Sequence, residues 1–305
     1  MAFIEKQRHG KHDYYYLVKS VRLSPSKVGK ARIFLGRKVP PHGELQAYFR
    51  ELERKIPKPY APKWLPTETV ERLEDLLGAA VAFRGLKDES TPADFLVRFT
   101  YNTNAIEGNP LSLRQTALIL ADGIVPQGAK TQDVMEVLNG RDAFEFVKAY
   151  KGSLSKSFAC RIQYEITKNT KCRIQGGYRD SEVRISGSDW KPPAAKEVAE
   201  NMQRSFNHYG KEKKALHPVE LASWLHNSIA QIHPFTDGNG RTARLLMNWV
   251  LVKNKLPPVI IEVRNKEEYY KAIEEADKGK QKPFAEFLAK QLLEQYTVFE
   301  KEKNK

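Results

Sequence analysis

The chain has 305 residues, enough for one large domain or two, and its composition is typical of a soluble globular protein, with 41% hydrophobic and 29% charged residues. It lacks a run of about 18 apolar residues, so we expect no transmembrane helix, and its first residues lack the apolar stretch of a signal peptide. Cys160 and Cys172 have no metal-ligand spacing, so we expect reduced thiols in a cytoplasmic protein.

The net charge of +14 has two interpretations. Basic proteins often bind nucleic acid or anionic surfaces. In this chain Lys and Arg are interspersed with Asp and Glu on most predicted helix faces, and the clearest local excess is at the N-terminus. We therefore favour a solvated surface over a dedicated nucleic-acid site, and we leave nucleic acid open as a partner.

Residues 1–60 are predicted to form an appendage. Residues 14–22 and 31–35 are rich in tyrosine and β-branched residues, and the turn-like segment 24–30 joins them into a two-stranded β-ribbon. Its tyrosines and basic residues suit a nucleic acid or a partner protein, but an isolated ribbon is only marginally stable, so we favour one packed on the main domain. A helical pattern follows near 43–56.

The proline-rich linker 56–66 is the predicted domain boundary, which leaves residues 61–305 as the main domain. Helical periodicity dominates from Thr67 onward. Apolar residues at 73, 76, 77 and 81 mark the first predicted helix, a second ends at Gly108, and a third opens at Ser112 with a capping box to Gln115. Further helices are predicted around 134–147, 158–166, 198–206, 266–277 and 282–300. At residues 173–185 the spacing of apolar residues changes from helical to strand-like, which predicts a small β-hairpin. The predicted fold class is therefore mainly α.

The densest chemistry lies in the stretch His-Pro-Phe-Thr-Asp-Gly-Asn-Gly-Arg-Thr-Ala-Arg at 233–244. Helical patterns flank it on both sides, while Pro234 and the glycines interrupt them, so it is predicted to be helix, tight loop, helix. Glycines allow backbone N–H groups to converge, and the new helix opens with an N-terminus that attracts anions. Arg241 and Arg244 are three residues apart and can face the same side. The stretch is suited to phosphate.

This stretch resembles the complete signature of the Fic family, His-Pro-Phe-x-Asp-Gly-Asn-Gly-Arg-x-x-Arg. The resemblance extends from about Phe95 to Leu288 and includes Gly-Tyr-Arg-x-x-x-Val at 177–183 and Arg-x-x-x-x-Tyr-Tyr-x-Ala at 264–272. It implies an all-α bundle that transfers AMP from ATP to a hydroxyl side chain of a target protein.

Side-chain chemistry suits that reaction. A protein hydroxyl that attacks the α-phosphate of ATP needs a base, for which His233 is suited. Backbone N–H groups around Gly238 and Gly240, and the Asn239 amide, are suited to stabilise the developing charge. His217 and His226, in contrast, are expected to be core or helix-end residues.

The remaining signature residues have expected roles with the triphosphate. Asp237 is the only carboxylate in the loop and hence the expected Mg²⁺ ligand. Arg241 and Arg244 are expected to hold the β- and γ-phosphates. Phe235 is expected to point into the core and fix the loop.

The predicted hairpin at 173–185 has two interpretations. It could merely cover an edge of the bundle. In the Fic family such a flap clamps an extended segment of the target by main-chain pairing. The resemblance therefore implies that Tyr178, Val183 and Ile185 help to bring the acceptor hydroxyl beside His233.

Glu107 lies at the predicted end of a helix, where the helix dipole disfavours an anion. Thr-Asn-Ala-Ile-Glu-Gly at 103–108 resembles the family's inhibitory motif, Ser/Thr-x-x-x-Glu-Gly/Asn, here N-terminal to the signature. The resemblance implies that Glu107 pairs with Arg244 and obstructs productive binding of the γ-phosphate. Thr103 would lie on the same face and steady the carboxylate. The alternative is an ordinary exposed glutamate.

We therefore predict an autoinhibited protein adenylyltransferase that uses ATP and Mg²⁺ and modifies a target protein, with itself as a further candidate target. Alternatives stay open: the same site could remove AMP from a modified protein, or the chain could be a nucleotide-responsive binding module with a basic N-terminal ribbon. The loop could also accept another nucleotide or a phosphocholine donor. A homodimer stays open, and we expect no membrane partner.

Overall fold

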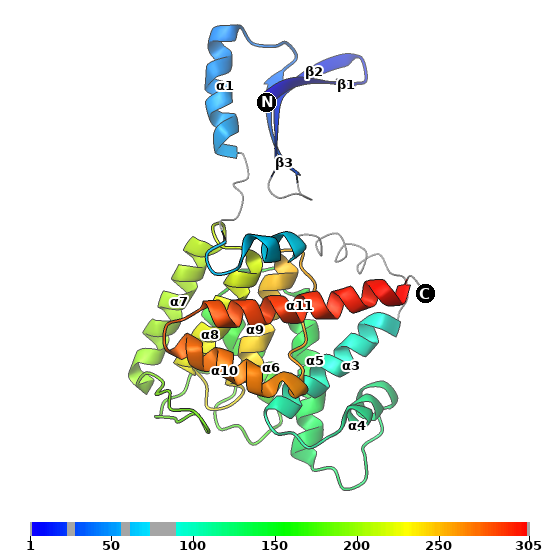
Figure 1. Cartoon of the computed structure of the whole chain (residues 1–305), viewed down its shortest axis with the longest axis vertical. Helices are drawn as coiled ribbons and strands as arrows, with labels where there is room; N and C mark the ends of the chain where they lie inside the picture. Colours follow the sequence, from blue (N-terminus) through cyan, green and yellow to red (C-terminus); the bar gives the residue numbers. More distant parts are fainter. Residues whose placement is uncertain (1, 23–27, 56–61, 74–89, 304–305) are drawn as a thin grey trace. The chain divides into compact units, whose positions relative to one another are not determined.

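The computed structural model describes residues 2–22, 28–55, 62–73 and 90–303 (Figure 1). Contacts divide the chain into two compact units, Met1–Ala61 and Pro62–Lys305. Residues 56–61 of the predicted linker lie outside the described residues, as do three of the four apolar residues (73, 76, 77 and 81) that mark the first predicted helix. The described part of the helix before that gap covers residues 67–73.

The first unit is a three-stranded antiparallel sheet with one helix. The strands β1 (Ala2–His9), β2 (His12–Arg22) and β3 (Val28–Gly36) pair in sequence order, with a bulge between Tyr15 and Tyr16, and α1 (His42–Lys55) follows. One face of the sheet packs on α1 around a small core of Leu17, Ala31, Ile33, Leu35 and Leu52.

The predicted ribbon has two strands, whereas the sheet in the structure has three. The overlooked strand β1 places a charged or polar residue at most positions from Glu5 onward, so it shows no clear alternation. Pairing, not burial, defines it, since Ile4 lies opposite Leu17 and His9 opposite His12. A third strand and a packed helix give the sheet the buried face that a lone hairpin lacks.

The second unit is a helical bundle. Its helices are α3 (Ser90–Ile106), α4 (Leu113–Ala117), α5 (Thr131–Ala149), α6 (Lys156–Thr167), α7 (Val198–Glu212), α8 (Pro218–Ile232), α9 (Asn239–Lys253), α10 (Lys266–Asp277) and α11 (Lys282–Lys303). Short helical turns are η1 (Leu118–Asp122), η2 (Ala195–Glu197) and η3 (Val263–Asn265). The predicted capping box of Ser112 with Gln115 is present at the start of α4. The mainly α fold is thus confirmed.

The pair α8 and α9 lies in the middle of this bundle (Figure 1). Helix α9 contacts α3, α5, α6 and α8, and apart from Gly240 its residues from Asn239 to Leu251 are all buried. Helix α8 begins at Pro218, which suits a first helical position, and His217 caps it by accepting the backbone N–H of Val219. The loop between α8 and α9 is therefore held by two helices that the core fixes on most sides.

The predicted β-hairpin at 173–185 is absent; this segment is an irregular loop without a strand. A hairpin requires the two arms to bond to each other, and here their backbone groups bond to other parts of the bundle. Gly176 N donates to Gln163 Oε1, and Arg179 N donates to Pro234 O at 2.8 Å. Gly176, with a positive φ, packs on Tyr164 and so allows this loop to lie against α6.

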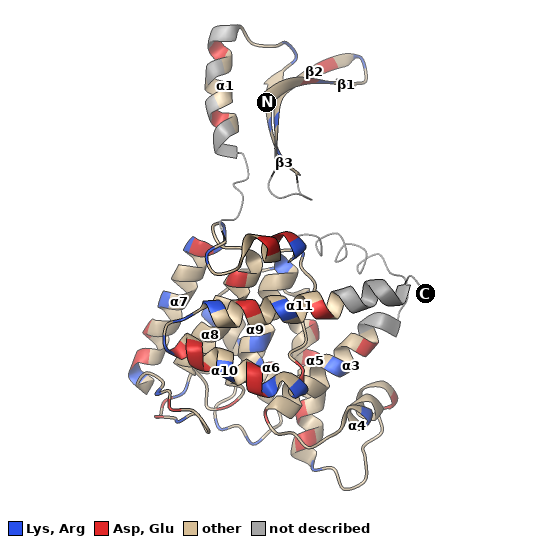
Figure 2. Cartoon of the chain, in the orientation of Figure 1, with Lys and Arg blue, Asp and Glu red and all other residues tan. Residues whose placement is uncertain are grey.

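Charged residues of both signs alternate over the helices of the second unit (Figure 2). Many of them form exposed pairs one helical turn apart, such as Arg204 with Glu200 and Arg98 with Asp94. Among the residues that the structure describes, none of the helices is both long and apolar enough to span a bilayer.

Candidate active site

His233 ends α8 in a left-handed backbone conformation, with φ 50° and ψ 57°. Such a conformation is uncommon for a residue other than glycine and persists only where the surroundings hold it. Arg179 supplies that support, because its Nε donates to His233 O at 2.8 Å while its backbone N–H donates to Pro234 O. The buried Arg179 side chain thus fixes the turn that aims the imidazole.

The protonation state of His233 follows from one contact of the ring and from its burial. Its Nδ1 lies 3.3 Å from Ala230 O, and because a carbonyl only accepts, Nδ1 carries the proton and Nε2 is the basic nitrogen. Burial disfavours the charged imidazolium and lowers the pKa of His233 below 6.5, and the charge of Arg179 adds to this effect. The side chain is therefore a neutral base near pH 7.

The loop after His233 is anchored by Phe235, whose side chain is fully buried as predicted and packs on Tyr178. The Asn239 amide brackets the Phe235 backbone: its Oδ1 accepts the Phe235 N–H and its Nδ2 donates to Phe235 O, both at 2.9 Å. The sequence predicts that this amide stabilises the developing charge on the phosphate. In this structure the Asn239 side chain is buried and holds the loop instead.

Gly238 and Gly240 are the two positions of the loop where a side chain would not fit. Gly238 has φ 80°, in the left-handed region, and packs on Thr167 and Ile166. A Cβ at Gly240 would collide with the Glu107 carboxylate and crowd Arg244 Nη1 at 3.1 Å. The absence of a side chain at Gly240 is what lets Glu107 approach the N-terminus of α9.

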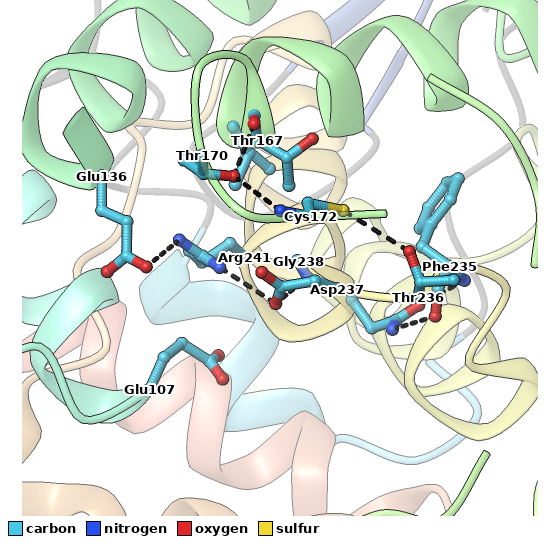
Figure 3. Close-up of polar contacts among 12 residues, drawn as sticks. Glu107, Glu136, Thr167, Thr170, Cys172, Phe235, Thr236, Asp237, Gly238 and Arg241 are labelled. Carbon is cyan, nitrogen blue, oxygen red and sulfur yellow. Dashed lines mark hydrogen bonds and ion pairs between the residues drawn. The ribbon is translucent and has the colours of Figure 1, made fainter. Parts of the chain in front are cut away.

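Asp237 and Arg241 form one ion pair at the mouth of the loop (Figure 3). Asp237 Oδ1 accepts the Gly238 N–H at 2.6 Å and Arg241 Nη2 at 3.1 Å. Glu136 Oε1 lies 3.9 Å from Arg241 Nη1 on the other side. The Arg241 guanidinium is thus buried between two carboxylates, whereas the Asp237 side chain is 45% exposed.

The donors at Asp237 fit a magnesium ion that is bound together with a nucleotide. The hydrogen bonds from Gly238 and Arg241 both reach Oδ1 of the carboxylate, and the side chain is nearly half exposed to solvent. Among the described residues no cluster of three or more acidic, histidine or cysteine side chains is placed to hold a metal. Mg²⁺ usually keeps several waters and binds through one or two carboxylates plus substrate phosphates, so a single carboxylate suffices.

Arg244 is a fully engaged buried cation, 2% exposed. Its Nη2 donates to Glu107 Oε1 at 2.7 Å and to Thr103 O at 2.9 Å, and its Nε donates to Thr103 Oγ1 at 2.9 Å. The predicted pairing of Glu107 with Arg244 is present. Thr103, expected to steady the carboxylate, holds the guanidinium instead, because both of its oxygens point at Arg244 and none of its contacts reaches Glu107.

Glu107 is ionised in this setting. Partial burial opposes ionisation, but the charges of Arg244 and Arg241 and the hydrogen bond from Arg244 outweigh it, and the pKa of Glu107 lies below 4.5. Its side chain keeps about a third of its surface exposed, 34%, so the carboxylate borders the cleft. A negative charge therefore lies beside Gly240 at the N-terminus of α9, a position that favours anions.

A hydrogen-bonded relay behind Arg244 was not evident from the sequence. Tyr269 Oη accepts from Arg244 Nη1 at 3.2 Å and lies 2.8 Å from His226 Nε2, and His226 Nδ1 lies 3.1 Å from Asn227 Oδ1. Burial lowers the pKa of His226 to about 3, so the ring is neutral: it donates to Asn227 and accepts from Tyr269. His226 is a core residue, as predicted, but it also supports the arginine.

A second overlooked group underlies the loop from the side of α6. Buried Gln163 donates to Asp237 O and Ile174 O, both at 3.2 Å, and the Cys172 thiol lies 3.4 Å from Thr236 Oγ1 (Figure 3). Cys160 and Cys172 are both free. Such contacts join segments that are far apart in sequence, so no local pattern could have revealed them.

A cleft of about 630 Å³ opens at this site, lined among others by Glu107, His233, Gly240, Arg244 and Ile185. Of the three predicted flap residues, only Ile185 borders it. Tyr178 is turned inward onto Phe235, and Val183 is partly buried outside the lining. His233, the N-terminal turn of α9 and the buried Arg244 thus border one cavity.

Residues 153–251 match the model of the Fic/DOC family. The chain carries a Fic domain. It is 36% identical over 196 residues to the protein adenylyltransferase Fic of Nematostella vectensis, which covers 62% of this chain and 45% of that protein. It is 32% identical over 198 residues to the protein adenylyltransferase fic-1 of Caenorhabditis elegans, covering 63% of this chain and 39% of that protein. The chain thus spans less than half the length of these curated relatives.

Solved structures agree in fold. A Fic-domain-containing signaling protein from Bacteroides thetaiotaomicron superposes with a TM-score of 0.67 at 27% identity, covering 75% of this chain and 94% of that one. A fragment of Fic-1 from C. elegans superposes with a TM-score of 0.67 at 25% identity, and the match covers 86% of this chain and 76% of that fragment. The bundle of α3 to α11 is therefore a Fic fold.

Proposed function

We propose that this Fic domain is an autoinhibited protein adenylyltransferase that transfers AMP from ATP to a hydroxyl side chain of a target protein. One observation carries the proposal. The neutral His233 shares a cleft with the glycine-rich start of α9, at which Arg244 is held by Glu107. Relatives named protein adenylyltransferase support the reaction type.

The reaction needs one proton acceptor and fixed donors for phosphate. The acceptor oxygen attacks the α-phosphorus in line, and the bond from that phosphorus to the oxygen that bridges to the β-phosphate breaks. The hydroxyl proton passes to His233 Nε2, and pyrophosphate leaves with the bonding electron pair. Backbone N–H groups at Gly240 and the first turn of α9 are suited to receive the phosphate charge.

Two side chains of the signature would bind the triphosphate, one through Mg²⁺ and one directly. Asp237 would hold Mg²⁺, which when bound neutralises charge on the phosphates and on the leaving pyrophosphate. Arg244 would bind the γ-phosphate once Glu107 leaves it, because a buried guanidinium favours a replacement anion over an unpaired state. Arg241 is held by Asp237 and Glu136, and we assign it a role in orienting Asp237.

Autoinhibition follows from the place of one carboxylate. Glu107 uses the arginine that the γ-phosphate needs, and it lies against Gly240 at the phosphate-binding helix start. Two anions cannot share that position without several kcal/mol of repulsion, so ATP binds unproductively or weakly while Glu107 stays. The target segment would lie along the 184–188 border of the cleft, within reach of His233.

A transfer assay with intact-mass readout tests the function. The full chain carrying Glu107→Gly is incubated with ATP, Mg²⁺ and cell lysate. The intact masses of the modified proteins, including the chain itself, are then measured by mass spectrometry. The proposal predicts a mass gain of one AMP on a hydroxyl. A gain of one phosphate, a gain from another nucleotide in preference to ATP, or release of AMP from a pre-modified protein without any transfer would overturn it.

A further inference from the structure

The sheet of the first unit has a second face, opposite the one that packs on α1. Strand register defines it, since directly paired residues lie on the same side of an antiparallel sheet. Glu5, Tyr16 and Phe34 are paired across the three strands, and Phe3, Val18 and Arg32 form the neighbouring row. Their in-between neighbours, such as Leu17 and Ile33, belong to the core under α1 and confirm the alternation. We call this second side the outer face.

Aromatic rings gather on the outer face. The rings of Tyr14 and Tyr16 lie 6.0 and 5.2 Å from that of Phe34, and His9 lies 5.8 Å from Tyr14. Phe34 is 53% exposed and Phe3 is 49% exposed. A large apolar side chain at this exposure loses the free energy that its burial would give, so a row of them on one face indicates a ligand surface.

Positive charge surrounds these rings. The Arg32 guanidinium lies 3.8 Å above the Tyr16 ring, and Arg37 lies 5.8 Å from the Tyr14 ring. Exposed Lys30 lies on the same side of β3 as Arg32. Among the described residues of the outer face the carboxylate is Glu5, which accepts from Arg32 at 3.1 Å and from Gln7 at 2.8 Å. The face is therefore cationic and aromatic.

The whole first unit, and not only its outer face, has a positive net charge. Residues 1–61 contain 14 Lys and Arg against 5 Asp and Glu, a net charge of +9, while the whole chain has +14. One fifth of the residues thus supplies most of the net charge. A polyanion is the complementary partner, whereas an acidic peptide would leave the exposed rings without a matching flat surface.

From this combination we propose that the outer face binds single-stranded nucleic acid, with bases stacked on Tyr14, Phe34 and Phe3 and phosphates bound by Lys30, Arg32 and Arg37. Bases have flat faces that stack on aromatic side chains, and each such contact is insensitive to sequence. A duplex hides those faces, and a sheet that enters a groove needs polar groups at its centre, where this sheet has rings.

Fluorescence anisotropy on the full chain tests this inference. The probe is a labelled oligothymidylate of about 12 nucleotides, within the footprint of known single-strand binders. An oligouridylate of the same length distinguishes DNA from RNA as the source, and binding of either supports the proposal. We expect log Kobs to fall with log salt at a slope of roughly −2, as for three cations on a single strand.

Matched variants locate the surface. Phe34→Ala should weaken binding about tenfold or more, the effect of losing one stacked base. Its control is Phe49→Ala, an aromatic residue 40% exposed on α1, which should bind normally. Lys30→Gln should lower the salt slope by about 0.7, while exposed Lys290→Gln in the second unit should not.

Three results would overturn the inference: no binding at low salt, equal losses in Phe34→Ala and Phe49→Ala, or a duplex bound as tightly as the single strand. A change from dimer to monomer in Phe34→Ala without nucleic-acid binding would also overturn it and would assign the face to a second copy of the chain. AMP transfer by Phe34→Ala should stay unchanged, which separates this inference from the proposed enzyme activity.

Discussion

Arg244 Nη2 donates a 2.7 Å hydrogen bond to Glu107 Oε1, which joins the N-terminal half of α9 to the C-terminal end of α3 across 137 residues of chain. The arginine side chain is almost completely buried, while the carboxylate borders the cleft. The pair is therefore accessible to a competing anion from one side only. We therefore expect a nucleotide to displace the glutamate and not the arginine, which makes Glu107 the suited movable partner.

Glu107→Gly should raise AMP transfer roughly 5- to 150-fold, the range of typical coupling free energies between two ligands of one site. Removal of the carboxylate frees Arg244 and clears the space beside Gly240. Glu107→Gln keeps the size but not the charge, so it should give a smaller increase. Transfer rates with labelled ATP check this, and equal rates in wild type and Glu107→Gly would contradict the inhibitory role.

Mild acid should not relieve this inhibition. The pKa of Glu107 lies below 4.5 when the Arg244 pair is formed, so the carboxylate stays ionised as the pH falls toward that value. A group whose pKa is lowered on folding stabilises the protein above its unfolded pKa, and that contribution is lost only at more acidic pH. Activation of the wild type between pH 7 and 5, absent in Glu107→Gly, would contradict this assignment.

The loss of AMP-transfer activity at acidic pH should reflect the protonation of His233. The imidazole acts in its neutral form, and burial lowers its pKa below 6.5, so activity of the Glu107→Gly variant should fall by half only at a pH below 6.5. His233→Ala should lower transfer by about 10²- to 10⁴-fold at every pH while ATP still binds. A midpoint above 6.5 would argue against a buried neutral base.

Tyr269→Phe should change the position of the Arg244 guanidinium by removing one of its hydrogen-bond partners. Loss of the hydroxyl leaves Arg244 Nη1 and the buried His226 Nε2 without their common partner, at a cost of about 1–3 kcal/mol in the free energy of unfolding. In the Glu107→Gly background we expect a raised KM for ATP and a smaller change in kcat. Tyr270→Phe is the matched control, since its hydroxyl makes one long contact of 3.4 Å to Ile106 O. Equal effects of both variants would exclude a positioning role for Tyr269.

Asp237→Asn should raise the Mg²⁺ concentration needed for half-maximal transfer roughly tenfold, about 1.4 kcal/mol of lost binding free energy. The amide oxygen of asparagine can still accept the Gly238 N–H, but the buried Arg241 loses the charge of one of its two carboxylate partners, so the melting temperature should fall modestly. Asp277→Asn, another carboxylate on the cleft, serves as control. Chelation of the metal should stop transfer in every variant, and transfer that persists in chelator would remove magnesium from the account.

Much of this site could be predicted from the sequence because its residues are local. The base, the glycines and the arginines lie within twelve residues of 233–244, and helical periodicity on both sides fixed the order of helix, loop and helix. Phe235 belongs to the same short stretch, and its burial is confirmed. The pairing of Glu107 with Arg244 came from a motif resemblance, since nothing in spacing alone joins residues so distant.

Residues that support the site from a distance escaped prediction. Arg179, Gln163 and Tyr269 act through hydrogen bonds to groups that become neighbours only in the folded bundle. The hairpin prediction was wrong for the same reason, because the backbone groups of 173–185 found partners on α6 and the active-site loop. Thr103 was placed on the correct helix face, but its oxygens bond to the guanidinium.

We propose that His233 and Glu107 act on one AMP-transfer site with opposite effects. The most direct measurement compares transfer from ATP labelled at the α-phosphate and at the γ-phosphate in wild type, Glu107→Gly, and Glu107→Gly combined with His233→Ala. We predict that only the α-label is transferred, strongly by Glu107→Gly, weakly by wild type, and not detectably by the double variant. Transfer of the γ-label, or undiminished transfer by the double variant, would contradict the account.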